Sequence, residues 1–178
     1  MRIKSLFAAL SALILLSGCA QLPALSGSSE LGPDEKMFVE MMVPHHEQAI
    51  QMSDLAPSRT QTAEVLAMAE KIKLGQEPEI ELMEGWLGEG HTHDNSHAGH
   101  GGMDGMLTED EMAALEAASG SEFDKLFLEG MIKHHEGAIE MLSLLDSSED
   151  AKVLELRDQI EAVQLDEIAQ MKALLANY

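Results

Sequence analysis

Two adjacent histidines, set among methionines, occur twice in this chain. Residues 38–56 read FVEMMVPHHEQAIQMSDLA and residues 127–145 read FLEGMIKHHEGAIEMLSLL, and ten of these nineteen positions are identical at an offset of 89. Imidazole nitrogen and thioether sulfur both bind metals, and the soft sulfur suits Cu(I) or the similar ion Ag(I). The duplicated pattern therefore predicts a site for a soft metal ion.

Helical spacing gathers these groups on one side of each segment. At about 100° per residue, a methionine before the histidine pair and a methionine after it share a face with the first histidine of each pair. The residues on this face are Met42, His45 and Met52 in the first copy, and Met131, His134 and Met141 in the second. His46 and His135 lie about 100° further round, and we expect them to face a seam between helices.

Two simpler interpretations compete with metal binding. Methionine is a common core filler, and a buried histidine is more often satisfied by a hydrogen bond than by a metal. The recurrence of the histidine pair beside methionine at matched spacing favours ligation over chance packing. Zinc would explain the histidines but not the methionines, and calcium and magnesium prefer oxygen ligands.

A second repeat lies downstream of each histidine pair. Residues 66–87 match residues 154–175 at an offset of 88. The matched polar and methionine positions are Gln76/Gln164, Glu79/Glu167 and Met83/Met171. Each set falls on one inward face at i, i+3 and i+7. The two glutamates could serve as ligands, but we expect them to hydrogen-bond across the bundle.

The fold expected from these repeats is all-α. The helical periodicity of the apolar residues and the capping residues predict four long helices and one short one. No segment alternates apolar and polar residues as a strand would, so we expect no sheet. The expected helices cover residues 34–55, 62–87, 108–120, 121–145 and about 147–177, with caps at Asp34, Thr108, Ser121 and Ser147 or Ser148. We therefore predict one domain over residues 34–178, a four-helix bundle of two duplicated hairpins, residues 34–87 and 121–178.

The segment between the hairpins, residues 88–107, is rich in glycine, histidine and methionine. Its candidate ligands are His91, His93, His97, His100, Met103 and Met106. Short histidine-rich tracts often bind metals, although such a segment can also be a polar disordered loop. We expect this flexible linker to hold Cu(II) or Cu(I) loosely and to raise the copper concentration near the bundle.

The N-terminus has the features of a lipoprotein signal. Arg2 and Lys4 precede an apolar run that is too short to span a membrane as a mature anchor. The run ends in Leu-Ser-Gly-Cys19, which resembles a bacterial lipobox; an ordinary signal peptide with a chance cysteine is the alternative. We expect residues 1–18 to be removed, Cys19 to be lipidated, and residues 19–33 to form a flexible tether. The protein would then be held by lipid on the periplasmic side of the envelope, at the outer membrane.

Charge and cysteine content exclude several functions. The 178 residues carry 11 Lys and Arg against 32 Asp and Glu, a net charge of −21. Such an acidic chain is unsuited to nucleic acid or to spontaneous docking on anionic lipid. The single cysteine excludes an intramolecular disulfide and any multi-cysteine metal site.

The paired motifs Met-Val-Pro-His-His-Glu-Gln-Ala-Ile-Gln-Met and Met-Ile-Lys-His-His-Glu-Gly-Ala-Ile-Glu-Met resemble the CopM-like family. This ferritin-like group is catalogued as a domain of unknown function, and the resemblance covers roughly residues 34–178. It implies a ferritin-like four-helix bundle in the periplasm that binds copper and supports copper tolerance. The ligands that it implies are Met42, His45, His46, Met52 and Met83, with Met131, His134, His135, Met141 and Met171.

Three functions compete at this point. We expect a non-catalytic protein that binds Cu(I), with Ag(I) or Cu(II) as alternatives, for copper buffering, trafficking or resistance. Its copper-delivery or efflux partner is not identified by the sequence. A di-metal oxidoreductase would need Glu-x-x-His on two helices, and no histidine of the long helices follows a glutamate by three positions. A structural module that binds a protein partner is the third alternative.

Overall fold

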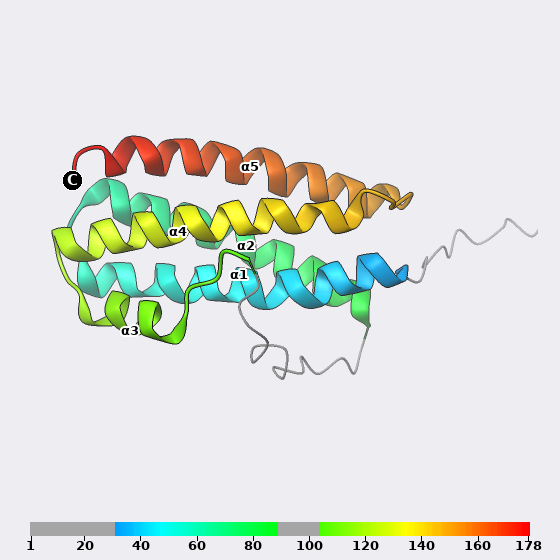
Figure 1. Cartoon of the computed structure of the whole chain (residues 1–178), viewed down its shortest axis with the longest axis horizontal. Helices are drawn as coiled ribbons and strands as arrows, with labels where there is room; N and C mark the ends of the chain where they lie inside the picture. Colours follow the sequence, from blue (N-terminus) through cyan, green and yellow to red (C-terminus); the bar gives the residue numbers. More distant parts are fainter. Residues whose placement is uncertain (1–30, 89–103) are drawn as a thin grey trace, which may run out of the picture.

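The computed structural model describes residues 31–88 and 104–178, and these residues form helices and connecting turns without any strand (Figure 1). The elements are α1 (Pro33–Arg59), α2 (Ala63–Leu87), α3 (Glu109–Ala117), α4 (Ser121–Met141), the 3-10 helix η2 (Leu142–Leu145) and α5 (Ala151–Leu175). The prediction of an all-α bundle of two hairpins with a short helix between them is confirmed. No helix in the described ranges is long and apolar enough to cross a membrane.

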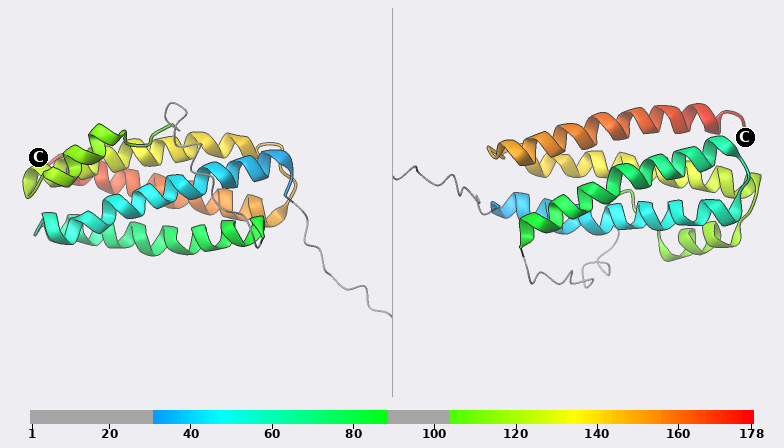
Figure 2. Two further views of the ribbon diagram at one scale, coloured as in Figure 1. Left: turned by 90° about the horizontal axis from the view of Figure 1, so that it is seen from below. Right: turned by 180° about the vertical axis from the view of Figure 1, so that it is seen from behind.

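The four long helices lie side by side, and each hairpin contributes two antiparallel neighbours (Figures 1 and 2). The end of α2 and the start of α4 lie at opposite ends of the bundle, so the connection between the hairpins runs its whole length. As a result α1 and α4 are antiparallel, and so are α2 and α5. A bundle with one long crossover is the connectivity found in ferritin-like folds.

The first helix begins and ends differently from the sequence expectation. Gly32 caps α1 in place of Asp34, and its N–H donates to the Glu35 carboxylate at 2.7 Å. Proline is tolerated at the next position because the N–H that it lacks would have no helical partner there. The expected stop before Pro57 is wrong, since α1 continues to Arg59 and simply goes without one donor in its last turn.

The other helix ends mostly agree with expectation. Thr108 caps α3 through a capping box, in which its hydroxyl accepts from the Glu111 N–H at 3.2 Å. The third long helix, α4, begins at Ser121 as expected but changes to a 3-10 turn after Met141. Asp150, rather than a serine, caps α5 by accepting from the Lys152 N–H at 2.9 Å.

The apolar core divides into two clusters at opposite ends of the bundle. The Phe127 cluster includes Met52, Phe127, Met131 and Met171. The Phe38 cluster includes Phe38, Met42, Met83 and Met141. Because α1 and α4 are antiparallel, each cluster combines residues of both repeats. The methionines that sequence order assigns to one repeat are therefore shared between two sites.

The segment Asp104–Thr108, called here the strap, crosses α1 and α4 before α3 begins (Figure 1). The Gln48 amide pairs with the Leu107 backbone in both directions, donating to its carbonyl at 3.0 Å and accepting from its N–H at 2.8 Å. On the other side Gly137 lies so close under the strap that a Cβ there would overlap the Asp104 carbonyl. Gln48 and Gly137 are equivalent positions of the repeat, so the two copies diverge where they hold the strap.

We predict that Gly137→Ala destabilises the protein, by about 1–3 kcal/mol, because the added methyl must push the strap away from α4. The matched control is Gly85→Ala on α2, where a Cβ meets nothing within 4 Å. That change should stabilise the helix by up to about 1 kcal/mol. Urea unfolding of both variants measures the difference, and equal behaviour would contradict the close contact.

Candidate metal centre

Two of the four motif histidines meet at the centre of the bundle. His45 of α1 and His134 of α4 are completely buried, and their ring centroids are 3.7 Å apart with the planes inclined at 44°. They are equivalent residues of the two repeats, so their contact marks the point where the duplicated halves are related to each other. We call them the inner pair.

The other two histidines, called here the outer pair, face the second helix of their own hairpin. His46 Nε2 lies 2.9 Å from an Oε2 atom of Glu79 on α2, and His135 Nε2 lies 2.8 Å from Oε2 of Glu167 on α5. All four side chains are buried. The expected orientation of the outer histidines toward a helix seam is confirmed. The glutamates form hydrogen bonds as expected: each contacts a histidine of its own hairpin, and Glu79 also accepts across the bundle from Gln159 at 3.3 Å.

These hydrogen bonds decide which ring nitrogen is free. An ionised carboxylate can only accept, so the Nε2 of His46 and of His135 must carry the donated proton. Nδ1 of each ring is then an unprotonated lone pair, and it is buried without a hydrogen-bond partner. A histidine that donates one N–H to a carboxylate and presents its other nitrogen is the usual arrangement of a metal ligand.

The inner histidines also have ring nitrogens without hydrogen-bond partners. His45 Nε2 donates to the Asp104 carbonyl of the strap at 3.2 Å, which leaves Nδ1 of His45 without a partner. Neither ring nitrogen of His134 makes a hydrogen bond. Buried polar atoms nearly always have a hydrogen-bond partner, because burial removes their hydrogen bonds to water and costs free energy unless a new hydrogen bond replaces them. The four buried Nδ1 atoms without partners are therefore candidate ligand atoms.

Burial favours the neutral form of His45, His134 and His135. It lowers the pKa of His45 to about 3, assisted by the nearby His46 and opposed by the Asp104 carbonyl. Burial also lowers the pKa of His134 well below its usual value, assisted by His45, whose backbone carbonyl lies nearby and opposes the shift. The pKa of His135 is lowered by burial although Glu167 opposes this. Neutral imidazole is the form that binds metals.

Thioethers flank the histidines at one helical turn. Met42 precedes His45 by three residues and His46 by four, and Met131 has the same relation to His134 and His135. Helical side chains lean toward the N-terminus, so each histidine leans toward the turn that carries this methionine. Met42 and Met131 are both completely buried. They are the thioethers best placed to join the imidazoles.

The remaining predicted methionine ligands are divided between the two core clusters. Met52 and Met141 are buried but lie two helical turns, about 10 Å, beyond the inner histidines of their own helices. Met83 and Met171 are buried in the same two clusters. Met52 thus accompanies Met131, and Met141 accompanies Met42. In the described residues no three His, Cys, Asp or Glu side chains form a metal-binding group.

Several predicted residues lie outside the described ranges. They are Cys19, His91, His93, His97, His100 and Met103. Met106 is described and lies half-buried in the strap. The contact between the strap and His45 was not foreseen. Its only sequence signal is the divergence of Gln48 and Gly137 between otherwise similar repeats.

The fold and the centre together define an all-helical bundle protein with a duplicated, buried histidine pair. A family model for DUF305, a domain of unknown function, matches residues 35–175. The chain therefore belongs to the DUF305 family. A search of curated proteins found no match to this chain.

Solved structures of the same family resemble this one closely. A DUF305 fragment from Deinococcus radiodurans is 33% identical, with a TM-score of 0.72 over 83% of this chain and 98% of that one. CopM in its Cu(II)-bound form is 34% identical, with a TM-score of 0.69 over 80% of this chain and 96% of CopM. CopM in its Cu(I)-bound form is 31% identical, with a TM-score of 0.63 over the same shares.

We predict that the metal-free protein loses stability as the pH falls below 6.5. The unfolded chain takes up protons on histidine there, whereas folded His45 stays neutral down to about pH 3. His45→Gln should therefore flatten the fall in unfolding free energy between pH 6.5 and 5 by up to about 1.4 kcal/mol per pH unit. Chemical unfolding with a chelator present measures this, and identical slopes in parent and variant would contradict it.

Proposed function

We propose that this protein binds a soft monovalent ion, Cu(I) or Ag(I), through imidazole nitrogen and thioether sulfur at the centre of the bundle. The observation that carries this proposal is the set of four buried Nδ1 atoms without partners, two of them on rings oriented by buried glutamates. His45, His134, His46 and His135 would supply nitrogen, and Met42 and Met131 would supply sulfur.

The donor chemistry favours a soft ion of low charge. These imidazoles and thioethers are enclosed, so an ion that enters must leave its water behind. A monovalent ion loses less hydration energy than a divalent one, and sulfur binds Cu(I) and Ag(I) far better than it binds zinc or magnesium. The carboxylates of Glu79 and Glu167 place negative charge directly behind two of the ligands.

The relatives support the same ion class. CopM, about 30% identical to this chain, has been crystallised in Cu(I)-bound, Cu(II)-bound and Ag-bound forms. A DUF305 relative from Streptomyces coelicolor, 29% identical, is described as a candidate secreted protein. These relatives support a role in copper binding outside the cytoplasm for the present chain.

We further propose the cellular role that the sequence favours. The protein is a lipoprotein anchored through Cys19, on the periplasmic side of the outer membrane, and the histidines and methionines of its linker collect copper near the bundle. It buffers, transfers or sequesters the ion and has no catalytic activity. The buried glutamates support binding over oxidase chemistry, because each already accepts a hydrogen bond from an outer histidine.

The proposal is tested by removing sulfur without changing the packing. Met42→Leu combined with Met131→Leu should weaken Cu(I) and Ag(I) binding by at least about tenfold, because each leucine keeps the volume but removes a soft donor. Anaerobic titration against a competing chelator measures the affinity. Met37→Leu is the matched control, since Met37 lies on the same helix with 42% of its surface exposed.

A second pair of variants tests the nitrogen donors. His45→Gln with His134→Gln should lower Cu(I) affinity and should also abolish any zinc binding in the bundle, whereas the methionine variants should leave zinc affinity unchanged. Unchanged Cu(I) affinity and stoichiometry in both double variants would refute the proposed centre. Circular dichroism confirms that each variant keeps its helical fold.

A further inference from the structure

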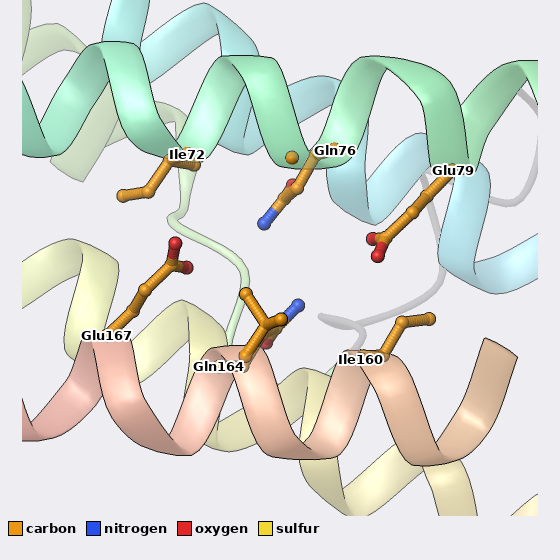
Figure 3. Close-up of a pocket in the computed structure, with 8 residues that line it drawn as sticks. Ile72, Gln76, Glu79, Ile160, Gln164 and Glu167 are labelled. Carbon is orange, nitrogen blue, oxygen red and sulfur yellow. The ribbon is translucent and has the colours of Figure 1, made fainter. Parts of the chain in front are cut away.

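A small cavity between α2 and α5 is built from equivalent residues of the two repeats (Figure 3). The residues around it form four pairs at an offset of 88, namely Ile72/Ile160, Gly75/Val163, Gln76/Gln164 and Glu79/Glu167. The cavity therefore lies on the pseudo-twofold axis that relates the two halves. The inner histidine pair, His45 and His134, lies on the same axis but on the α1 and α4 side of the bundle.

Two glutamines give this cavity its polar character. Gln76 and Gln164 are only 4% and 2% exposed, and both atoms of each amide lack a hydrogen-bond partner. Figure 3 shows the two amides extending from α2 and α5 into the space between the helices. The cavity volume of about 10 Å³ is close to the smallest that holds one water molecule. Four buried amide atoms facing so small a space indicate that a polar occupant passes through it or stays in it.

The cavity lies between exposed residues of α2 and α5 and the two glutamates that contact the outer histidines. Gly75 and Val163 at its rim are exposed, whereas Glu79 and Glu167 in its wall are buried. These are the same glutamates that hold the outer histidines at 2.9 and 2.8 Å. Their second carboxylate oxygens have only long contacts, 3.3 Å from Gln159 and 3.8 Å from Lys71. Amides and carboxylates therefore line the same cavity, and the carboxylates are the groups that contact the outer histidines.

The opposite side of the bundle is covered. There the strap lies across α1 and α4, and its Asp104 carbonyl accepts a hydrogen bond from His45. Gln48 holds the strap at two points, and Gly137 permits its close approach to α4. An ion approaching from this side would have to displace these contacts. Within residues 31–88 and 104–178, no comparable segment crosses α2 and α5.

We propose that the soft cation enters the bundle along its pseudo-twofold axis through the cavity between α2 and α5, where the amide oxygens of Gln76 and Gln164 replace its water. This inference rests on the proposed function, because it assigns an access route to that centre. The glutamines are positioning groups on the route and are not ligands of the final site. Rings of amide or carbonyl oxygens that replace a hydration shell serve ion passage in the same way in channels.

The first test narrows the rim. Gly75→Leu should slow Cu(I) uptake by about tenfold while the equilibrium affinity stays within about twofold, because the new side chain covers the opening without touching the centre. A Cβ at Gly75 meets nothing within 4 Å, so the variant should fold normally. Gly85→Leu is the matched control, an equally open glycine on the same helix that does not line the cavity. Stopped-flow transfer of Cu(I) from a chromogenic chelator to the full-length protein measures the rate.

The second test removes the amides. Gln76→Leu with Gln164→Leu should also slow uptake by about tenfold, because the ion must lose its water without a replacement oxygen. The same variant should be at least as resistant to urea as the parent, since it removes four buried atoms that have no partners. Slower uptake with unchanged affinity and undiminished stability supports the route.

The outcomes separate this inference from the proposed function. If the parent binds Cu(I) tightly and both variants take it up at the parent rate, the route is wrong and the proposed function stands. If the glutamine variant loses equilibrium affinity, the amides belong to the binding site and the route is again wrong. If the parent binds neither Cu(I) nor Ag(I), both proposals fail together.

Discussion

The structure depends on the burial of four imidazoles in the middle of a helical bundle. Such rings are costly in an apolar core unless their nitrogens are paired, and this protein pairs them only in part. Glu79 and Glu167 orient the outer rings, and the strap carbonyl of Asp104 orients His45. The Nδ1 atoms of the four rings remain without hydrogen-bond partners, and most of the proposed chemistry follows from these free nitrogens.

Gene duplication explains the arrangement, and divergence explains its asymmetry. The antiparallel relation of α1 and α4 brings equivalent histidines into contact and mixes methionines of both repeats in each core cluster. Three pairs of equivalent positions have diverged where the two sides of the bundle differ. Gln48 and Gly137 hold the strap, Gly75 and Val163 border the cavity, and Lys133, which replaces Pro44, forms an ion pair with Glu111 of α3 at 3.0 Å.

The choice of neutral soft donors suits the compartment that the N-terminus predicts. Thiolates outside the cytoplasm are exposed to disulfide formation, whereas thioethers are not. An enclosed methionine and histidine centre could therefore hold Cu(I) without exposing a reactive thiol. The strongly acidic surface, with a net charge of −21, would attract cations toward the bundle at low salt. In the proposed function, the acidic surface would supply long-range attraction and the buried donors a short-range preference for soft ions.

Much of this was predictable from local pattern. The helices, the duplication, the shared face of Met42 and His45, and the turn of His46 toward a seam all follow from helical period, which depends on neighbouring residues alone. The contact of His45 with His134, the exchange of Met52 and Met141 between clusters, the strap over His45 and the cavity at Gln76 and Gln164 do not follow from it. Periodicity fixes the face that a helix buries but not the direction or register of its distant neighbour, and a long crossover permits more than one arrangement. Packing of the whole chain made that choice, and with it decided which imidazoles and sulfurs share a centre.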